Sequence, residues 1–384
     1  MGALDSNERK LLVPGGSNPK YAAGHLLFLR EQTLMAQPFD IERLELTGDP
    51  VPIAEQVAEG GLTGAAGAFS VSDTGLLAYQ SGTILSRLVW FDRTGMQLGV
   101  VGDDADYDDV KLSPDETRVG VTMPDQITGT TDIWVVDAKR GIRTRFTSDP
   151  AVDRWPVWSP DGGHIIFGSN RNARNGLYQK ASNGPGFEDE LTAGPGEAIP
   201  VDWTLDGRFL VYNAASHGPG TDLSMLPLSG DRKPVTLLNV SVRDTAGRVS
   251  PDGKWIAYVS DESGRLEVYV TSFPKAGAKW QISSGGGDWP RWRRDGREIF
   301  YVAPDNRVMA AAVTAQASTF TVGQVSSLFE IRPRLSQAIR GVAAPPYDVS
   351  ADGQRLLVNT LLRDAAATPI TLVVNWPALL KTRR

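Results

Sequence analysis

The chain has 384 residues with 39 Lys or Arg against 45 Asp or Glu, so its formal net charge is -6 at pH 7. This balance argues against a nucleic-acid-binding protein, because such proteins carry a basic surface. The chain has no cysteine, which excludes disulfides, thiolate zinc sites and cysteine nucleophiles. No run of residues approaches the ~20 apolar residues that a membrane span needs, so we expect no membrane insertion by this chain itself.

The first twelve residues, Met1 to Leu12, lack the basic and then apolar pattern of a signal peptide. If the protein works outside the cytoplasm, a preceding segment must therefore deliver it. If it is free-standing, this sequence predicts a cytoplasmic protein.

The first repeat of the chain is degenerate. Tyr21–Gly24 stands where later repeats carry a turn motif, and the strand-like run His25–Phe28 follows it. Such a pair of short runs around a Gly-containing turn is typical of a β-hairpin.

A clearer turn motif then returns about every 45 residues, the period of a four-stranded propeller blade. It reads Ser-Pro-Asp-Gly at Ser159–Gly162 and at Ser250–Gly253. Proline presets the backbone of such a turn, aspartate bonds nearby amides and glycine accepts a left-handed conformation. Looser copies keep the aspartate, and the motif aspartates are Asp73, Asp115, Asp161, Asp206, Asp252, Asp295 and Asp352.

Each turn lies between strand-like runs rich in β-branched and aromatic residues. Trp155–Trp158 precedes the turn at Asp161, and His164–Phe167 follows it. A third run such as Asp132–Asp137 and a more polar fourth run such as Ile142–Phe146 complete a repeat. Four antiparallel strands in each repeat are the plan of a propeller blade.

The repeats together predict an all-β fold, a single β-propeller of eight four-stranded antiparallel blades, with seven blades as the alternative. The domain covers 1–384, with blades from about 19 to 376 and a short C-terminal tail at 377–384. The last repeat has only three strand-like runs, ending at 370–376. We expect the segment at about 8–13 to supply its fourth strand and to close the ring.

The seventh repeat is longer than the others and contains two apparent insertions, at 314–320 and 332–344. Both look like loops. Loops on a rigid scaffold often carry function, although tolerated surface insertions look the same in a sequence.

Recognisable catalytic motifs are absent from the sequence. There is no Gly-x-Ser-x-Gly elbow and no phosphate-binding loop. The three histidines, His25, His164 and His217, lie in different repeats without metal-ligand spacing. The acidic run Asp103–Asp109 could bind calcium but lacks the spacing of an EF-hand loop, which favours a solvated acidic loop. We therefore expect no catalytic residue, no metal and no cofactor.

The residues just before each inner strand form a candidate ligand site. In a propeller these positions surround one mouth of the central channel, and convergent aromatic and charged groups in a hollow are typical of a binding site. Packing between neighbouring blades is the alternative interpretation. The candidates are Tyr107, Asp108, Asp153, Arg154, Trp155, Glu197, Arg243, Asp244, Asp288, Trp289, Arg291 and Tyr347.

The stretch Asp153–Gly162 resembles the WD40-like repeat of the TolB type, the PD40 repeat, and Arg248–Tyr258 resembles it as well. The runs Gly24–Phe28, Thr33–Asp40 and Leu46–Pro52 resemble the C-terminal propeller of bacterial membrane-anchored serine/threonine protein kinases. The terminal runs Tyr347–Asn359 and Val374–Trp376 resemble the same lineage. The chain lacks the kinase domain and the membrane helix of that family.

The resemblance implies a non-enzymatic binding or sensing module that recognises a protein, a peptide or a small ligand at one mouth of the channel. It implies an extracytoplasmic, periplasmic location if the propeller belongs to such a kinase. Two alternatives stay open. One is a propeller enzyme, a lyase or glycoside hydrolase with two channel carboxylates. The other is the accessory propeller of a peptidase related to prolyl oligopeptidase.

Overall fold

The structure is a computed structural model. It describes residues 12–13, 17–30, 33–55, 57, 68–80, 85–125, 130–171, 176–184, 186–191, 198–215, 221–238, 244–316, 319–335, 344–362 and 370–381. The chain divides into two compact units. The larger unit comprises 85–336 and 342–361, and the smaller unit comprises 1–84, 337–341 and 362–384.

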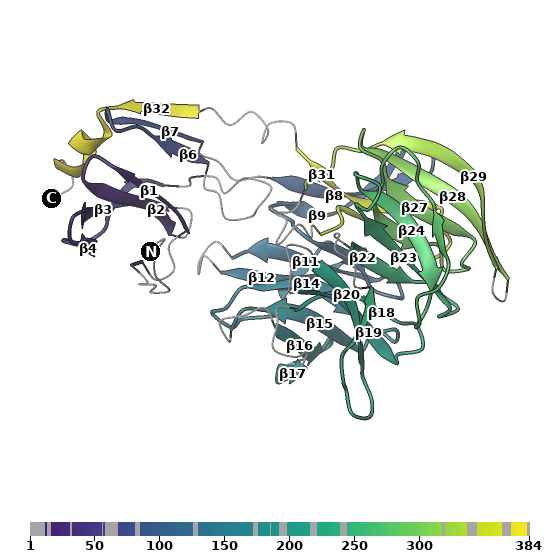
Figure 1. Ribbon diagram of the computed structural model, residues 1–384. Coiled ribbons are helices and arrows are strands. Elements are labelled where there is room, and N and C mark those ends of the chain that lie inside the picture. Colours follow the sequence, from purple (N-terminus) through teal and green to yellow (C-terminus); the bar gives the residue numbers. More distant parts are fainter. Residues whose placement is uncertain are drawn as a thin grey trace. The chain divides into compact units, whose positions relative to one another are not determined.

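The larger unit contains six four-stranded antiparallel sheets (Figure 1). Five of these sheets are built from strands in chain order. They are β10 (Val110–Leu112), β11 (Arg118–Pro124), β12 (Thr131–Asp137) and β13 (Arg143–Arg145); β14 (Asp153–Trp158), β15 (His164–Ser169), β16 (Gly176–Ala181) and β17 (Asp189–Leu191); β18 (Ala198–Trp203), β19 (Phe209–Ala215), β20 (Thr221–Pro227) and β21 (Val235–Leu238); β22 (Asp244–Val249), β23 (Trp255–Ser260), β24 (Glu267–Ser272) and β25 (Lys279–Gln281); and β26 (Asp288–Trp292), β27 (Glu298–Val302), β28 (Arg307–Gln316) and β29 (Thr319–Glu330).

The sixth sheet joins the two ends of the larger unit. Its strands are β30 (Tyr347–Val349), β31 (Arg355–Leu361), β8 (Ser86–Asp92) and β9 (Gln97–Ala105), in that order. On one side it shares a buried core with β10–β12, which includes Leu88, Val119 and Leu357. On the other side β30 and β31 share a core with β27 and β28, which includes Phe300 and Tyr347. The six sheets therefore close a ring, a β-propeller.

Five of the six turns in the ring use one hydrogen-bond pattern, and in the sixth Arg293 donates to Asp295 instead. In the copy at 250–253, the Ser250 hydroxyl donates to the Asp252 carboxylate over 2.6 Å and accepts the Trp255 amide over 3.0 Å. Gly253 adopts a φ of 69° and donates its amide to the Ser250 carbonyl. Equivalent side-chain bonds begin at Ser113, Ser159, Thr204 and Ser350. The predicted turns are therefore confirmed, and they fix the register between the first two strands of each blade.

The inner strands carry bulges near their midpoints. The pairing of β14, β22 and β26 with the next strand shifts register, and Trp155, Ala246 and Trp289 adopt positive φ values of 60°, 55° and 53° there. A β-bulge bends its strand and redirects the side chains that follow it. Non-glycine residues with positive φ cost free energy and persist where the surrounding structure holds them, often at functional sites.

The smaller unit contains two sheets. One has β1 (Ser17–Ala22), β2 (His25–Arg30), β3 (Thr33–Asp40), β4 (Glu45–Leu46) and β5 (Val51–Ala54), and the other has β32 (Ile370–Val374), β7 (Leu76–Gln80) and β6 (Phe69–Val71). A 3₁₀ helix, η2 (Trp376–Lys381), ends the described chain. Its fully buried Trp376 packs in a core with Leu27, Leu34 and Leu77.

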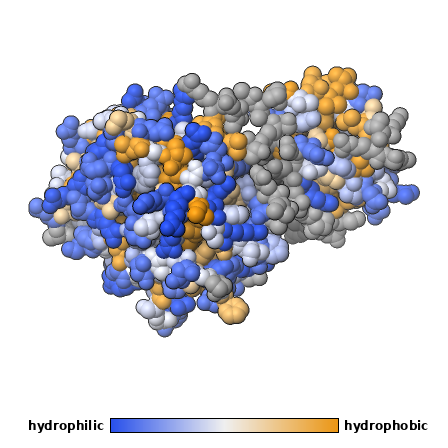
Figure 2. Space-filling view, turned by 180° about the vertical axis from the view of Figure 1, so that it is seen from behind, coloured by the Kyte–Doolittle hydropathy of each residue, from blue (hydrophilic) through white to orange (hydrophobic). Residues whose placement is uncertain are grey.

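One face of β32 is apolar and exposed. Ile370, Leu372 and Val374 alternate along the strand and are 72%, 59% and 76% exposed. Figure 2 shows hydrophobic side chains gathered on the surface of the smaller unit. Alternation of this kind is what a strand shows when one of its faces is not covered.

The all-β class and the plan of antiparallel blades are confirmed, and the described residues form eight sheets in total, the number of predicted repeats. Six of the eight close a ring within the larger unit. The inclusion of all eight sheets in one ring over 1–384 stays a prediction.

Two strand assignments need correction. By the plan of one repeat, 86–91 would be the third run of the repeat at Asp73, and we expected 370–376 to complete the last blade. Instead β8 pairs with β31 through seven residue pairs, and β32 pairs with β7. The physical reason is burial, because β8 fills the core at Leu88 and Trp90 whereas β32 keeps one apolar face exposed.

The closing strand differs as well. Strands β8 and β9, which come early in the chain, complete the sheet of β30 and β31, so closure by an N-terminal segment occurs with other residues than 8–13. Of that predicted closing strand, only Leu12 and Val13 are among the described residues, and they lie in no strand.

The first predicted insertion, 314–320, is also not a loop. It lies largely in the hairpin of β28 and β29, because Phe320 packs in a core with Trp255.

Candidate ligand site

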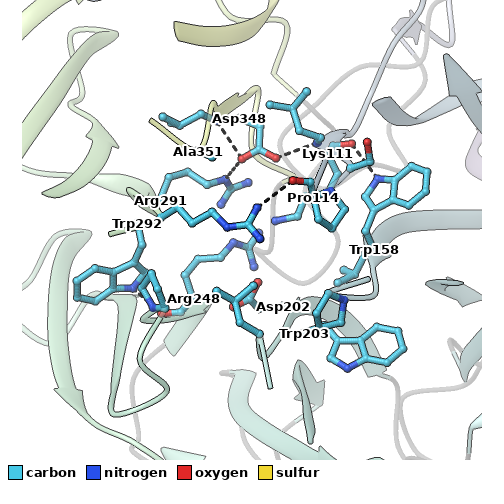
Figure 3. A pocket seen from close by; sticks show the side chains of 18 of the residues that line it. Lys111, Pro114, Trp158, Asp202, Trp203, Arg248, Arg291, Trp292, Asp348 and Ala351 are labelled. Atoms are coloured by element: carbon cyan, nitrogen blue, oxygen red, sulfur yellow. Dashed lines mark hydrogen bonds and ion pairs between the residues drawn. The ribbon is translucent and has the colours of Figure 1, made fainter. Parts of the chain in front are cut away.

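The candidate site is a cavity of about 190 Å³ in the larger unit, at the ends of the inner strands (Figure 3). Each of the six inner strands places one residue there, two positions before the first residue of its turn motif. We call these six residues the channel ring. They are Lys111, Val157, Asp202, Arg248, Arg291 and Asp348.

β-Bulges orient four of the six ring residues. Register shifts immediately precede Val157, Asp202, Arg248 and Arg291 in their strands. In Figure 3 the side chains of Arg248 and Arg291 reach into the same space between Asp202 and Asp348. The strained backbone of the inner strands thus directs charged groups into the channel.

The two acidic members of the ring bind the neighbouring blade. The Asp202 carboxylate accepts the amide of Val249 over 2.9 Å, and the Asp348 carboxylate accepts the amide of Leu112 over 2.9 Å. Asp348 also accepts a hydrogen bond from Arg291 Nε over 3.1 Å. Positive neighbours and this amide bond outweigh burial and lower the pKa of Asp348, so it is a carboxylate at neutral pH.

The basic members keep hydrogen-bond donors without partners. Arg248 is 7% exposed and Arg291 is 4% exposed. Arg248 Nη1 donates to the carbonyls of Val201 and Gly247, and Arg291 Nη1 donates to the Pro290 carbonyl. Arg248 Nε and Arg291 Nη2, however, are buried and have no partner among the described residues. Buried donors without partners are rare and call for a physical reason.

Lys111 faces the same space. Its ammonium group interacts electrostatically with the carboxylates of Asp348 and Asp202. Burial lowers the pKa of Lys111 to about 8, with Arg248 and Arg291 adding to the decrease and Asp348 opposing it. Burial and the charge of Arg291 likewise lower the pKa of Arg248. The ring therefore holds its positive charges at a cost in free energy.

Three tryptophans line the wider part of the cavity, next to prolines and Leu205. The Trp158 indole donates to the Lys111 carbonyl over 3.1 Å, and the Trp292 indole donates to the Arg248 carbonyl over 2.9 Å. The Trp203 indole donates to the Gly207 carbonyl over 3.2 Å. Because each indole donor is already used, the tryptophans offer ring faces to a ligand and hold the backbone of two ring cations in place.

Arg291 is the sequence-predicted site residue that lines this cavity. Most of the others begin the inner strands and are buried or bonded. The Tyr347 hydroxyl donates to the Trp289 carbonyl over 2.9 Å, and the Tyr107 hydroxyl donates to the Asp103 carbonyl over 2.7 Å. The Asp288 carboxylate accepts the Trp289 amide over 2.7 Å.

Two further predicted residues have buried carboxylates. Asp153 accepts hydrogen bonds from Arg171 over 3.1 and 3.2 Å, and burial raises its pKa in spite of this partner. Asp244 is 2% exposed, and burial raises its pKa to about 6. Trp155 donates its amide to Asp109 and is buried. Glu197 and Arg243 lie outside the described residues.

Asp108 and Arg154 do come together, in a network that the sequence did not indicate. Arg154 lies 3.4 Å from Asp108, and Arg334 binds Asp108 over 2.8 Å and Asp106 over 2.7 Å. Arg334 comes from the second predicted insertion, 332–344, of which 336–343 lie outside the described residues. Asp106 and Asp108 are thus already paired with arginines of the protein. A ligand site at the beginnings of the inner strands stays a prediction.

The acidic run at 103–109 is not the solvated loop that we expected. Asp104 pairs with Arg87 over 2.6 Å, and Asp109 is buried, where it accepts the Thr122 hydroxyl and the Trp155 amide. The described residues contain no group of three or more acidic or histidine side chains placed to hold a metal ion. They also contain no helix with the length and hydropathy that crossing a membrane requires.

Sequence reasoning missed Lys111, Asp202, Arg248 and Asp348. A signal was present, because all of them stand two residues before a turn motif. We assigned the channel mouth to the beginnings of the inner strands, whereas the cavity lies at their ends.

A ring of four-stranded blades around a channel with such a cavity belongs to the β-propeller class. A family model described as the TolB beta propeller domain matches residues 109–236. The chain is 24% identical over 204 residues to an uncharacterized protein of Agrobacterium fabrum, which covers 50% of this chain and 68% of that protein.

Two solved structures are also similar. The putative TolB from Agrobacterium tumefaciens has a TM-score of 0.59 and 16% identity, and the match covers 73% of this chain and 99% of that one. TolB from Acinetobacter baumannii has a TM-score of 0.45 and 16% identity, covering 90% of this chain and 79% of that one. The first of these structures confirms the β-propeller fold that the repeats predicted, and the family match over 109–236 agrees with the resemblance of the repeats to the TolB type.

Proposed function

We propose that this chain is a non-enzymatic binding module and that its ligand enters the cavity of the channel ring. The observation that carries the proposal is the pair of buried arginine nitrogens without partners, at Arg248 and Arg291. A buried donor that is left unpaired costs about 1–3 kcal/mol. A ligand that accepts hydrogen bonds from these donors would recover that free energy and bind through it.

The charges of the cavity favour binding over glycoside hydrolysis. A hydrolase of that kind needs one carboxyl group with a raised pKa to act as the acid. The pKa of Asp348 is lowered instead, and Asp348 and Asp202 each accept a backbone amide of the neighbouring blade. The two acidic groups of the channel ring are therefore suited to joining blades and balancing charge.

The size of the cavity limits what can enter. At about 190 Å³ it is smaller than the roughly 300–1,000 Å³ of sites for drug-sized ligands. It therefore suits a small molecule, or one or two residues of a protein or peptide partner whose remainder stays outside. The resemblance to TolB-type propellers supports a protein or peptide partner.

The resemblance to the C-terminal propellers of membrane-anchored kinases supports a more specific role, as the extracytoplasmic sensor of a signalling protein. Cell fractionation with an antibody against the larger unit tests this role. Recovery of the protein in the periplasmic or membrane fraction agrees with it, and recovery in the cytoplasm alone contradicts it.

A blocking substitution tests the position of the site. Leu205 lines the cavity and is 45% exposed, so Leu205→Trp should obstruct the entrance without removing any charge. Ile142, which is 59% exposed and does not line the cavity, provides the matched control Ile142→Trp. Ligands found by a thermal-shift screen of peptides and small molecules should lose binding in Leu205→Trp and keep it in Ile142→Trp. Equal binding to both variants would place the site elsewhere.

A further inference from the structure

The channel ring has one more positive than negative group. Its six positions hold three cations and two carboxylates, and the sixth residue is Val157. Arg294 and Glu116 also line the cavity and carry opposite charges, so the cavity as a whole keeps an excess of one positive group. A net positive charge within an enclosed space attracts an anion more strongly than it would in water.

The hydrogen-bonding groups of the ring that remain free are donors, whereas its acceptors are occupied. The acceptors Asp202 and Asp348 are occupied by amides of Val249 and Leu112, and Asp348 by Arg291 in addition. The donors Arg248 Nε and Arg291 Nη2 have no hydrogen-bond partner among the described residues, and the Lys111 ammonium group adds further donor capacity to the same cavity. A ligand that completes this set must supply acceptors and negative charge.

We propose that the channel ring binds a carboxylate group, which accepts hydrogen bonds from Arg248, Arg291 and Lys111. This inference rests on the proposed function and names the chemistry of its ligand. Arginine binds planar carboxylates in a matching geometry, and bonds between two ionised groups are stronger than those between neutral ones. An excess of one positive charge matches a monoanion better than the dianion of a phosphate.

The surroundings of the ring define the rest of the ligand. Trp158, Trp203 and Trp292 line the cavity together with Pro114, Pro160 and Pro251. Such a lining suits an apolar or extended body behind the carboxylate. A peptide with a free C-terminus and a small apolar carboxylic acid both have this form, so the shared chemistry is a carboxylate on an apolar body.

Three probes distinguish the chemistry: acetyl-dialanine with a free C-terminal carboxylate, its C-terminal amide, and inorganic phosphate. NMR of tryptophan-labelled protein can follow binding, because three of the ten tryptophans line the cavity. We expect the carboxylate to bind at least 10-fold more tightly than the amide, since each charge-assisted bond corresponds to roughly 10-fold to 100-fold in affinity. Equal binding of the amide, or tighter binding of phosphate, would overturn the inference.

Substitutions in the channel ring test whether its cations bind the carboxylate. Lys111→Met and Arg248→Met should each weaken carboxylate binding by roughly 10-fold to 100-fold, and Lys111→Arg should retain it. Arg307, which is 47% exposed on β28 and pairs with Asp305, provides the control Arg307→Gln, which should bind as the natural protein does. If Arg248→Met does not fold, Lys111→Met decides the test, because that substitution leaves the bonds of Asp202 and Asp348 to the amides of Val249 and Leu112 in place. Unchanged carboxylate affinity in Lys111→Met would refute the inference.

Two further probes, neutral butanol and cationic butylamine, distinguish failure of the carboxylate inference from failure of the proposed function. If a neutral or cationic probe binds, and Leu205→Trp abolishes that binding, the cavity is a ligand site but the carboxylate assignment fails. If neither the carboxylate nor these probes respond to Leu205→Trp, both the site and its chemistry are contradicted.

Discussion

The turn motifs and the channel ring lie only two residues apart in each blade, and they are built on opposite rules. The turns repeat one set of bonds from blade to blade, and in them the hydroxyl, the carboxylate and the glycine amide all have partners. The channel ring has lysine, valine, two aspartates and two arginines at equivalent positions, and one nitrogen of each arginine is buried without a partner among the described residues. Turns with the same residues and fully paired hydrogen-bonding groups build the scaffold. Positions with different residues and unpaired donors mark the candidate site.

The comparison explains why the ring aspartates resemble scaffold residues. Asp202 and Asp348 each bind an amide of the next blade, so they join neighbouring sheets as the turns join neighbouring strands. Lys111, Arg248 and Arg291 occupy the same positions and line the cavity, and Arg248 Nε and Arg291 Nη2 have no hydrogen-bond partner among the described residues. The same place in the repeat thus serves the fold in two blades and a ligand in three others.

The largest expected effect is on the scaffold. Trp158 is 4% exposed, donates to the Lys111 carbonyl and lies with its ring 4.6 Å from the Arg118 guanidinium carbon. Trp158→Ala should lower the free energy of unfolding by about 3–5 kcal/mol, as truncation of a buried aromatic side chain does. Denaturant unfolding measures this, with the exposed Ile142→Ala as control. An unchanged midpoint would contradict the role of Trp158 between two blades.

Lys111 should destabilise the fold when it is charged, whereas Trp158 stabilises it. Its folded-state pKa of about 8 lies below the ordinary value, so the unfolded chain binds the extra proton as pH rises from about 8 to about 10. The free energy of unfolding should therefore increase through this window, by up to about 3 kcal/mol relative to Lys111→Met. Urea unfolding of both proteins from pH 7 to pH 10 measures the difference. Parallel curves would show that Lys111 is not desolvated.

Asp244 tests whether a second buried charge outside the ring is costly. Burial raises its pKa to about 6, and its Oδ1 has no partner among the described residues. The folded state therefore holds the proton more tightly, and stability should fall as pH rises from about 4 to about 6. Asp244→Asn should remove that fall and be about 2 kcal/mol more stable at pH 7. Lower stability of Asp244→Asn at pH 7 would mean that the carboxylate is needed.

The smallest expected change concerns a single turn. Ser250→Ala removes the hydroxyl that the Trp255 amide and the Asp252 carboxylate share, and Ser250 is buried. The loss of one buried hydrogen-bond partner should cost about 1–2 kcal/mol. Ser263→Ala, in an exposed hairpin, is the matched control. If Ser250→Ala melts as the natural protein does, the turn bonds do not fix the register.

Local features of the fold were predictable because short-range chemistry decides them. The Ser-Pro-Asp-Gly turns and the hairpins around them follow from residues within a few positions of each other, and the period of the turns gave the blades. The pairing of β8 with β31 was not predictable in the same way. Blades of a repeat protein share one hydrophobic pattern, so the pattern alone does not tell which strands pair across a long separation in the sequence.

The site was predictable only in part, for a related reason. Arg291 was found because it follows the distinctive pair Asp288–Trp289. Lys111 and Arg248 were missed because single charged residues inside short apolar runs carry no motif, and the bulges that aim them depend on backbone geometry. Arg334 reaches Asp108 from 226 residues away, a contact that no local pattern announces.

The most direct test is to measure the carboxylate affinity and the unfolding free energy of the natural protein and Lys111→Met side by side at pH 7. If the ring keeps an unpaired cation for a ligand, the variant should be as stable or more stable and bind the free C-terminal peptide at least 10-fold more weakly. A variant that loses stability while keeping its affinity would show that Lys111 belongs to the scaffold and would contradict the account.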